Sequence, residues 1–175
     1  MDLFLVRHGE TQANTDGIVQ GWLDTTLNDK GVEQAKQAAA LFNENIDVIY
    51  SSDLRRARQT AAEFRQKYPN VPYFEDWRLR ERDFGDATGS HKDGFDWEIF
   101  WSSIDTVSIP NAETLDDLNE RLLSFIEAIK ASGYLRALIV THGGTINRLQ
   151  SLVTKDHNHI QHANASITHL VLELS

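Results

Sequence analysis

Two apolar segments of this 175-residue chain end in the same way, and this repeat constrains the fold most. Residues 3–6 form a short apolar run that predicts a buried strand, and the run stops at Arg7-His8-Gly9. Residues 134–140 form a second such run, which stops at Thr141-His142-Gly143. Parallel strands of an open α/β sheet end at one edge, where ligands bind. The sequence therefore predicts adjacent parallel strands with two histidines facing one pocket, and Gly9 is expected to let the backbone approach a ligand closely.

Helical and strand-like segments alternate along the rest of the chain. The 3.6-residue period of apolar side chains predicts three main helices, with Asn28-Asp29 capping the first, Ser52 or Asp53 the second, and Asn111 or Thr114 the third. The helices are expected over about residues 30–43, 54–68 and 114–131, another helix begins near residue 145, and further strands are expected at 46–50, 71–74 and 166–174. This alternation is typical of an α/β domain.

Composition excludes several classes of protein. The chain has 41% hydrophobic and 25% charged residues, no cysteine, and no apolar run near the roughly 20 residues that span a bilayer. The missing cysteines rule out disulfides and thiolate chemistry, and with no visible signal segment we expect a cytoplasmic protein without membrane association. A formal charge of −9 argues against nucleic-acid partners, so an anionic substrate would have to be drawn in by a local arginine cluster.

One such cluster stands at the predicted start of the second helix. Arg55, Arg56 and Arg58 lie in its first turn, where the helix dipole favours negative charge. Arginines at this position are instead suited to hold an anion together with the helix amides.

Four sequence blocks resemble the histidine phosphatase superfamily, also called the phosphoglycerate mutase-like family. The blocks are Arg7-His8-Gly9-Glu10-Thr11-x-x-Asn14, Ser52-x-Leu54-x-Arg56-Ala57-x-x-Thr60, Leu79-x-Glu81-Arg82-x-Phe84-Gly85 and Thr141-His142-Gly143-Gly144. Glu113-Thr114 is similar to a further short block of the family. The resemblance implies one three-layer α/β/α domain over residues 1–175, with a mostly parallel central sheet.

The resemblance also implies roles for the residues in these blocks. His8 would be the nucleophile and form a phosphohistidine, Glu81 would be the proton donor with Asp83 and Glu10 in reserve, and no cofactor or metal would be needed. Arginines next to His8 would keep its imidazole unprotonated and grip the phosphoryl oxygens. The expected catalytic residues are Arg7, His8, Arg56, Glu81 and His142, and the expected substrate-binding residues are Arg7, Asn14, Gln20, Gly21, Arg56, His142 and Gly143. Trp22 is a further candidate for the pocket wall.

Two regions lie outside these blocks. Residues 87–112 correspond to a lid-like segment that shapes substrate choice in the family, and here they carry an aromatic stripe of Phe95, Trp97, Phe100 and Trp101. The tail contains His157, His159, His162 and His169. We interpret these as exposed loop histidines, because no spacing among them completes a metal site.

The favoured function is hydrolysis of a small phosphorylated metabolite, with two alternatives. A bisphosphoglycerate-dependent phosphoglycerate mutase uses the same blocks, but Ser102-Ser103 stand where the mutases carry an arginine pair, and Phe84 replaces their tyrosine. A non-catalytic phosphate-binding module is the other alternative, although all expected catalytic side chains are present. The sequence leaves open which phosphomonoester is the substrate, and whether the protein is a monomer or a homodimer.

Overall fold

The computed structural model describes residues 1–94, 109–156 and 158–174. In this part of the chain a single sheet has the strand order β3-β2-β4-β1-β5. β1 pairs in parallel with β4, as expected for the two strands that end in histidine, and only β5 runs antiparallel. The strands are β1 (Asp2–Arg7), β2 (Val48–Ser51), β3 (Tyr73–Glu75), β4 (Arg136–Thr141) and β5 (Ile167–Val171).

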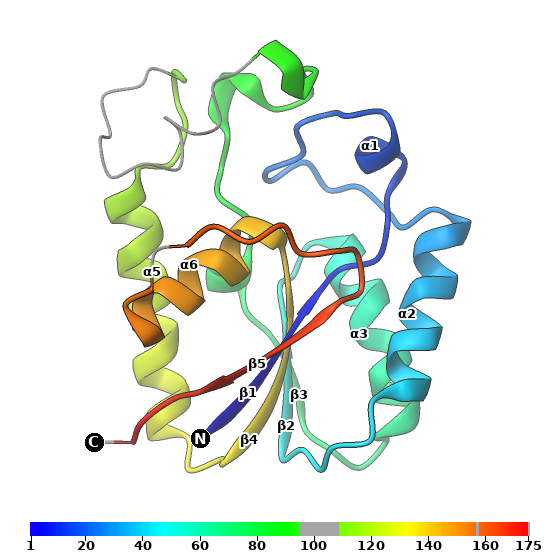
Figure 1. The fold of residues 1–175 in the computed structure, drawn as a ribbon, viewed down its shortest axis with the longest axis vertical. Coiled ribbons are helices and arrows are strands. Elements are labelled where there is room, and N and C mark those ends of the chain that lie inside the picture. Colours follow the sequence, from blue (N-terminus) through cyan, green and yellow to red (C-terminus); the bar gives the residue numbers. More distant parts are fainter. Residues whose placement is uncertain (95–108, 157, 175) are drawn as a thin grey trace.

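Helices cover both faces of the sheet, which gives the predicted three layers (Figure 1). α2 and α3 pack together on one face, and α5 and α6 cover the other (Figure 1). The helices are α1 (Gln12–Thr15), α2 (Asp29–Leu41), α3 (Arg55–Lys67), α5 (Leu115–Ala131) and α6 (Gly143–Thr154), with short 3-10 turns η1 (Trp77–Leu79), η2 (Gly85–Ala87) and η3 (Lys92–Gly94).

β1 shows how the sequence pattern separates the two cores. Leu3 and Leu5 belong to the buried cluster beneath α5 and α6, whereas Phe4 and Val6 belong to the cluster beneath α2 and α3. Successive side chains of a strand point to opposite faces, so a continuous apolar run supplies both layers. Each fully buried side chain of this size contributes about 1.5–3 kcal/mol to folding. The strand that carries the site is thus fixed from both sides.

α5 forms where its apolar period predicts. Thr114 caps it by accepting a hydrogen bond from the Asp117 amide at 3.0 Å, so Thr114 and not Asn111 is the cap. The six apolar positions of its inward face are all buried: Leu115, Leu118, Leu122, Phe125, Ile126 and Ile129. A charged residue, Arg121, is buried on the same helix.

The cap predicted for the second helix is wrong. α3 begins at Arg55, and its cap residue, Leu54, makes no side-chain cap bond. The Arg55 amide instead donates to Asp24 Oδ1 at 2.7 Å, while Asp53 forms an ion pair with Arg80 at 2.6 Å. The cap therefore comes from a loop that is distant in sequence, because the local carboxylate is engaged elsewhere.

The other predicted boundaries agree with the structure to within three residues, as is usual at the ends of elements. No helix in the described ranges is long and apolar enough to span a bilayer. The aromatic stripe at 95–101 and the Ser102-Ser103 pair lie outside the described residues.

Candidate active site

The two histidine-bearing strands end side by side, at the upper edge of the sheet in Figure 1. Arg7 is in register with Thr141, and the His8 amide donates to the Thr141 carbonyl at 2.9 Å. This register brings the rings of His8 and His142 to a centroid distance of 5.2 Å, with an angle of 60° between their planes. The predicted juxtaposition of the two imidazoles is therefore present.

The hydrogen bonding of His8 defines which ring nitrogen is free to react. Its Nδ1 lies 2.7 Å from the Gly9 carbonyl oxygen, which can only accept, so Nδ1 carries the proton and Nε2 the lone pair. Burial lowers the pKa of His8 well below its ordinary value, and the positive charges of Arg56 and Arg7 lower it further. His8 is therefore a neutral imidazole at physiological pH, with a nucleophilic Nε2.

Arg56 is held beneath the site by backbone carbonyls. Its Nη2 donates to the Gly21 carbonyl and its Nη1 to the Leu23 carbonyl, each at 2.7 Å. Burial lowers the pKa of Arg56 to about 10, which leaves the guanidinium charged at neutral pH. Arg55 and Arg58, the other two arginines in the first turn of this helix, are both exposed.

Arg7 is the second cation of the site. Its Nη1 donates to the His162 carbonyl, and burial lowers its pKa while the Glu81 carboxylate opposes that shift. Within the described residues, Arg7 Nε, Arg56 Nε and His142 Nδ1 are buried without a hydrogen-bond partner. A buried nitrogen without a hydrogen-bond partner costs free energy of folding. Two of these nitrogens belong to guanidinium groups and the third to an imidazole, so together they are suited to bind an anion with several acceptor oxygens.

His142 lies against His8 and is almost fully buried. Its Nε2 is 2.9 Å from Ser52 Oγ at the end of β2, so three adjacent strand ends contribute to one site. Burial lowers the pKa of His142 well below its ordinary value, and Arg56 adds to the shift. Both histidines are thus neutral.

Glu81 faces the histidines from the loop after η1. Its Oε2 accepts from the Gly144 amide at 3.0 Å, and its Oε1 accepts from the Arg82 amide at 3.0 Å. Gly144 is in the first turn of α6, where the helix dipole favours a carboxylate. The reserve acids lie elsewhere, since neither Asp83 nor Glu10 lines the cavity and Glu10 pairs with Lys30 at 2.8 Å.

A cavity of about 600 Å³ connects these groups. Eight of the nine predicted site residues line it; the ninth, His142, is not among the lining residues, but its ring lies against the ring of His8, which is. Trp22 is absent from the wall, and its Nε1 donates to the Glu81 carbonyl at 2.8 Å instead. The eight residues on the wall are Arg7, His8, Asn14, Gln20, Gly21, Arg56, Glu81 and Gly143.

Residues 159–162 form one wall of the cavity, and they were not predicted from the sequence as site residues. Asn147, in the second turn of α6, fixes this segment by bonding both the amide and the carbonyl of Ile160 at 2.9 Å. His162 is consequently 7% exposed, so its assignment as an exposed loop histidine was wrong, whereas His159 and His169 are exposed as expected. His157 lies outside the described residues. Asn147 lies four residues after Gly143, so the two share one face of the helix. This spacing is the signal in the sequence that could have identified Asn147 as a site residue.

Gly9 is not among the residues that line the cavity, and it approaches another part of the backbone closely. A Cβ at this position would lie 2.3 Å from the carbonyl oxygen of Gly31 in α2. Gly9 therefore permits a close contact between two backbones, and this contact fixes the loop behind His8.

Metal ligands are not clustered in the described parts of the chain, where no group of three His, Cys, Asp or Glu side chains could hold an ion. Metal independence remains a prediction.

Comparisons with known proteins identify the family of this chain. The family model for the histidine phosphatase superfamily (branch 1) matches residues 3–174. A metal-independent phosphoserine phosphatase of Arabidopsis thaliana is 33% identical over 95% of this chain and 74% of that protein. A 2,3-bisphosphoglycerate-dependent phosphoglycerate mutase of Azorhizobium caulinodans is 33% identical over 84% of this chain and 78% of that protein.

A solved structure gives the same assignment. The mycobacterial glucosyl-3-phosphoglycerate phosphatase in complex with VO3 is similar with a TM-score of 0.85 and 31% identity, covering 97% of this chain and 92% of that one. The chain therefore belongs to the histidine phosphatase superfamily, branch 1, and is a phosphoric monoester hydrolase.

Proposed function

We propose that the protein is a metal-independent phosphomonoesterase that works in two steps through a phosphohistidine at His8. The observation that carries this proposal is the state of His8: its Nδ1 proton is engaged by the Gly9 carbonyl, and its neutral Nε2 lies beside two buried guanidinium groups. A neutral imidazole next to an anion-binding group is the arrangement that nucleophilic attack on phosphorus requires.

In the first step, His8 Nε2 attacks the phosphorus atom and the bond to the ester oxygen breaks. Arg7 and Arg56 stabilise the charge on the equatorial oxygens, and the Nδ1 of His142 donates to a third position. This role requires the ring proton on Nδ1, and the Ser52 hydroxyl, 2.9 Å from His142 Nε2, would stabilise that tautomer by donating to Nε2. Glu81, in its protonated form, transfers a proton to the departing alkoxide.

In the second step, water replaces the released alcohol. The Glu81 carboxylate accepts a proton from this water, whose oxygen attacks the phosphohistidine, and His8 and inorganic phosphate are released. Asn14 assists in both steps. Its Oδ1 accepts from the Thr11 amide at 3.1 Å and from Asn164 at 3.3 Å, which leaves its NH₂ group as the donor toward substrate.

The substrate class we propose is a small phosphorylated metabolite. A cavity of about 600 Å³ lies within the range of small-molecule sites, roughly 300–1,000 Å³. The relatives named above include phosphatases for phosphoserine and for glucosyl-3-phosphoglycerate. Residues 87–112 would form the lid-like segment that selects among such esters, since Lys92 of this segment lines the cavity.

The proposal is tested by phosphate release from a panel of monoesters at pH 5–8 in the presence of EDTA. The panel includes phosphoserine, sugar phosphates and 3-phosphoglycerate, with and without bisphosphoglycerate, and His8→Ala is the matched control. We expect EDTA-resistant release and acid-labile phosphate on the protein, both absent from His8→Ala. Conversion of 3- to 2-phosphoglycerate without release would establish the mutase alternative, and phosphate binding without turnover would establish a non-catalytic module.

A further inference from the structure

The general acid Glu81 is held through its backbone as well as its carboxylate. Its carbonyl oxygen accepts from Arg121 Nη2 at 3.0 Å and from Trp22 Nε1 at 2.8 Å. Arg121 Nη1 also donates to the carbonyls of Arg78 at 2.5 Å and Arg80 at 2.9 Å. One guanidinium thus binds three carbonyls within four consecutive residues, and the last of these residues is Glu81.

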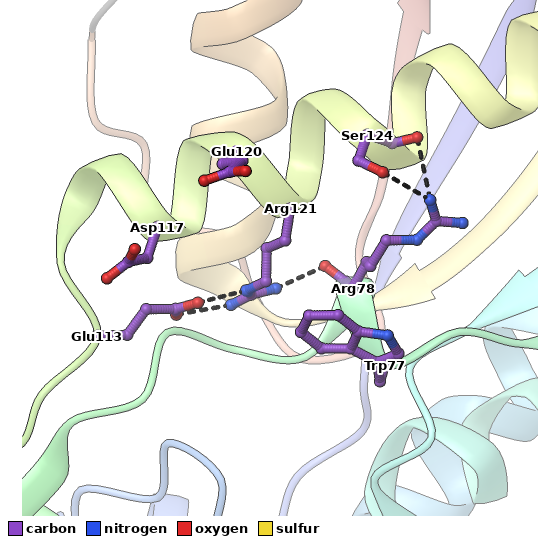
Figure 2. Close-up of a pocket in the computed structure, with 7 residues that line it drawn as sticks. All are labelled: Trp77, Arg78, Glu113, Asp117, Glu120, Arg121 and Ser124. Carbon is purple, nitrogen blue, oxygen red and sulfur yellow. Dashed lines mark hydrogen bonds and ion pairs between the residues drawn. The ribbon is translucent and has the colours of Figure 1, made fainter.

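Glu113 supplies the opposite charge for this guanidinium. The two side chains form a bidentate pair, with distances of 2.5 Å from Nε and 2.8 Å from Nη2, and they are 4% and 10% exposed (Figure 2). A buried guanidinium without a carboxylate partner carries a large desolvation cost, so Arg121 depends on Glu113 to remain in place. The carboxylate is therefore part of the support of Glu81, although it does not contact Glu81.

Glu113 also fixes the chain on the other side of Glu81. Its backbone amide donates to the Asp83 carbonyl at 3.0 Å, its Oε2 accepts from the Asp83 amide at 3.2 Å, and its carbonyl accepts from Arg82 Nε at 2.7 Å. The Arg121–Glu113 pair consequently secures the residues both before and after Glu81.

The pair lies away from the reacting atoms. Neither residue lines the catalytic cavity as the described residues define it. Both line a separate cavity of about 340 Å³ on the far side of the Glu81 loop, together with Trp77, Asp117 and Glu120 (Figure 2). The pair therefore reaches the site by hydrogen bonds through the backbone of Glu81, while the charge of Arg121 also helps to lower the pKa of His142. Arg121→Lys keeps that charge and removes the geometry of the hydrogen bonds.

We propose that Arg121 and Glu113 are positioning residues for proton transfer by Glu81. The inference rests on the proposed function, in which Glu81 protonates the leaving alkoxide. It makes a distinctive prediction, because only esters with a basic leaving group need this proton. Loss of the pair should impair phosphoryl transfer from alkyl monoesters and spare transfer from p-nitrophenyl phosphate, whose leaving group departs as an anion.

The experiment compares Arg121→Lys and Glu113→Gln with the wild-type protein. Glu120→Gln is the matched control, since it neutralises an exposed carboxylate on the wall of the same far-side cavity. Rapid-quench measurements follow phosphohistidine formation from phosphoserine, and stopped-flow measurements follow the burst of p-nitrophenolate. A general acid contributes about 100- to 10,000-fold. We expect about a 100-fold loss with the alkyl ester, a change within about threefold in the aryl burst, and no change in Glu120→Gln.

Equal losses with both esters, or no loss with either, would overturn the inference, because the pair would then act on the whole site or not at all. Glu113→Gln keeps the shape of the side chain and removes only its charge. If Arg121→Lys does not fold, the comparison of the two esters in Glu113→Gln decides the inference. Failure of the proposed function has a different signature, since the wild-type protein itself would then show neither a burst nor phosphohistidine. That result would also remove the inference, because there would be no proton transfer to position.

Discussion

The close contact between Gly9 and Gly31 leads to a quantitative prediction about His8, the proposed nucleophile. A Cβ on Gly9 would lie 2.3 Å from the Gly31 carbonyl oxygen, whereas ordinary contacts begin at 3.4 Å, so Gly9→Ala must open this contact by roughly 1.1 Å. The neighbouring atom belongs to a backbone and cannot rotate away. The Gly9 carbonyl is also the acceptor that holds His8 Nδ1, so the displacement passes directly to the imidazole ring of His8. A misplacement of about 1 Å costs about 100-fold in rate.

The assay measures kcat for p-nitrophenyl phosphate and the free energy of unfolding in urea. We expect Gly9→Ala to lose about 100-fold in kcat and about 1–3 kcal/mol in stability, as overpacked sites do. Gly31→Ala tests the same contact from the other side, since its Cβ would lie 2.0 Å from the Glu10 carbonyl oxygen. The stability that Gly31→Ala loses through this contact should exceed the gain of about 0.5–1 kcal/mol that alanine brings to a helix. Gly94→Ala, whose Cβ would meet no atom of the described residues within 4 Å, controls for stability. A Gly9→Ala protein with wild-type kcat would refute the coupling of this contact to His8.

Two further predictions concern the charges of the site. A lysine at position 56 cannot form the two hydrogen bonds that Arg56 donates to the Gly21 and Leu23 carbonyls. The inhibition constant for vanadate should therefore rise about 10- to 100-fold in Arg56→Lys. An unchanged inhibition constant would exclude Arg56 from anion binding. The lowered pKa values of His8 and His142 mean that the unfolded chain binds protons that the folded chain does not. The free energy of unfolding should therefore fall as the pH drops below about 6.5, by at most about 1.4 kcal/mol per pH unit for each histidine. In urea unfolding experiments, the free energy of unfolding of His8→Asn should change less with pH than that of the wild-type protein. The same slope in both proteins would contradict the neutral, buried state of His8.

The parts of the site that were predictable from sequence follow from local rules. His8 and His142 each follow a buried strand directly, so the geometry of parallel strands places them together without further information. Only the resemblance to the family singled out Arg56 as the catalytic candidate, because Arg55, Arg56 and Arg58 all lie in one helical turn. The structure shows the difference in burial, with Arg56 at 1% exposure.

The parts that were missed depend on contacts distant in sequence. The cap of α3 comes from Asp24, 31 residues before the amide it accepts from, and no rule about local caps can identify it. His162 is buried because Asn147 holds the segment before it. Arg121 lies within a helix whose apolar period is otherwise regular, and its partners are 8 and about 40 residues away. A buried charge on the apolar face of a helix is the one local signal that such a partner exists.

The electrostatics of the site are set by distance rather than by total charge. The chain has a formal charge of −9, but at physiological ionic strength exposed charges are screened beyond about 8 Å. Among the described residues that line the cavity, Arg7, Arg56 and Lys92 are cationic and Glu81 alone is acidic. Burial lowers the pKa of Arg56 only to about 10, so the site keeps its positive charge at neutral pH while both histidines stay neutral. The same desolvation therefore acts differently on the two kinds of group: the guanidinium groups stay charged because their ordinary pKa is far above neutrality, whereas His8 becomes unprotonated, as the proposed attack on phosphorus requires.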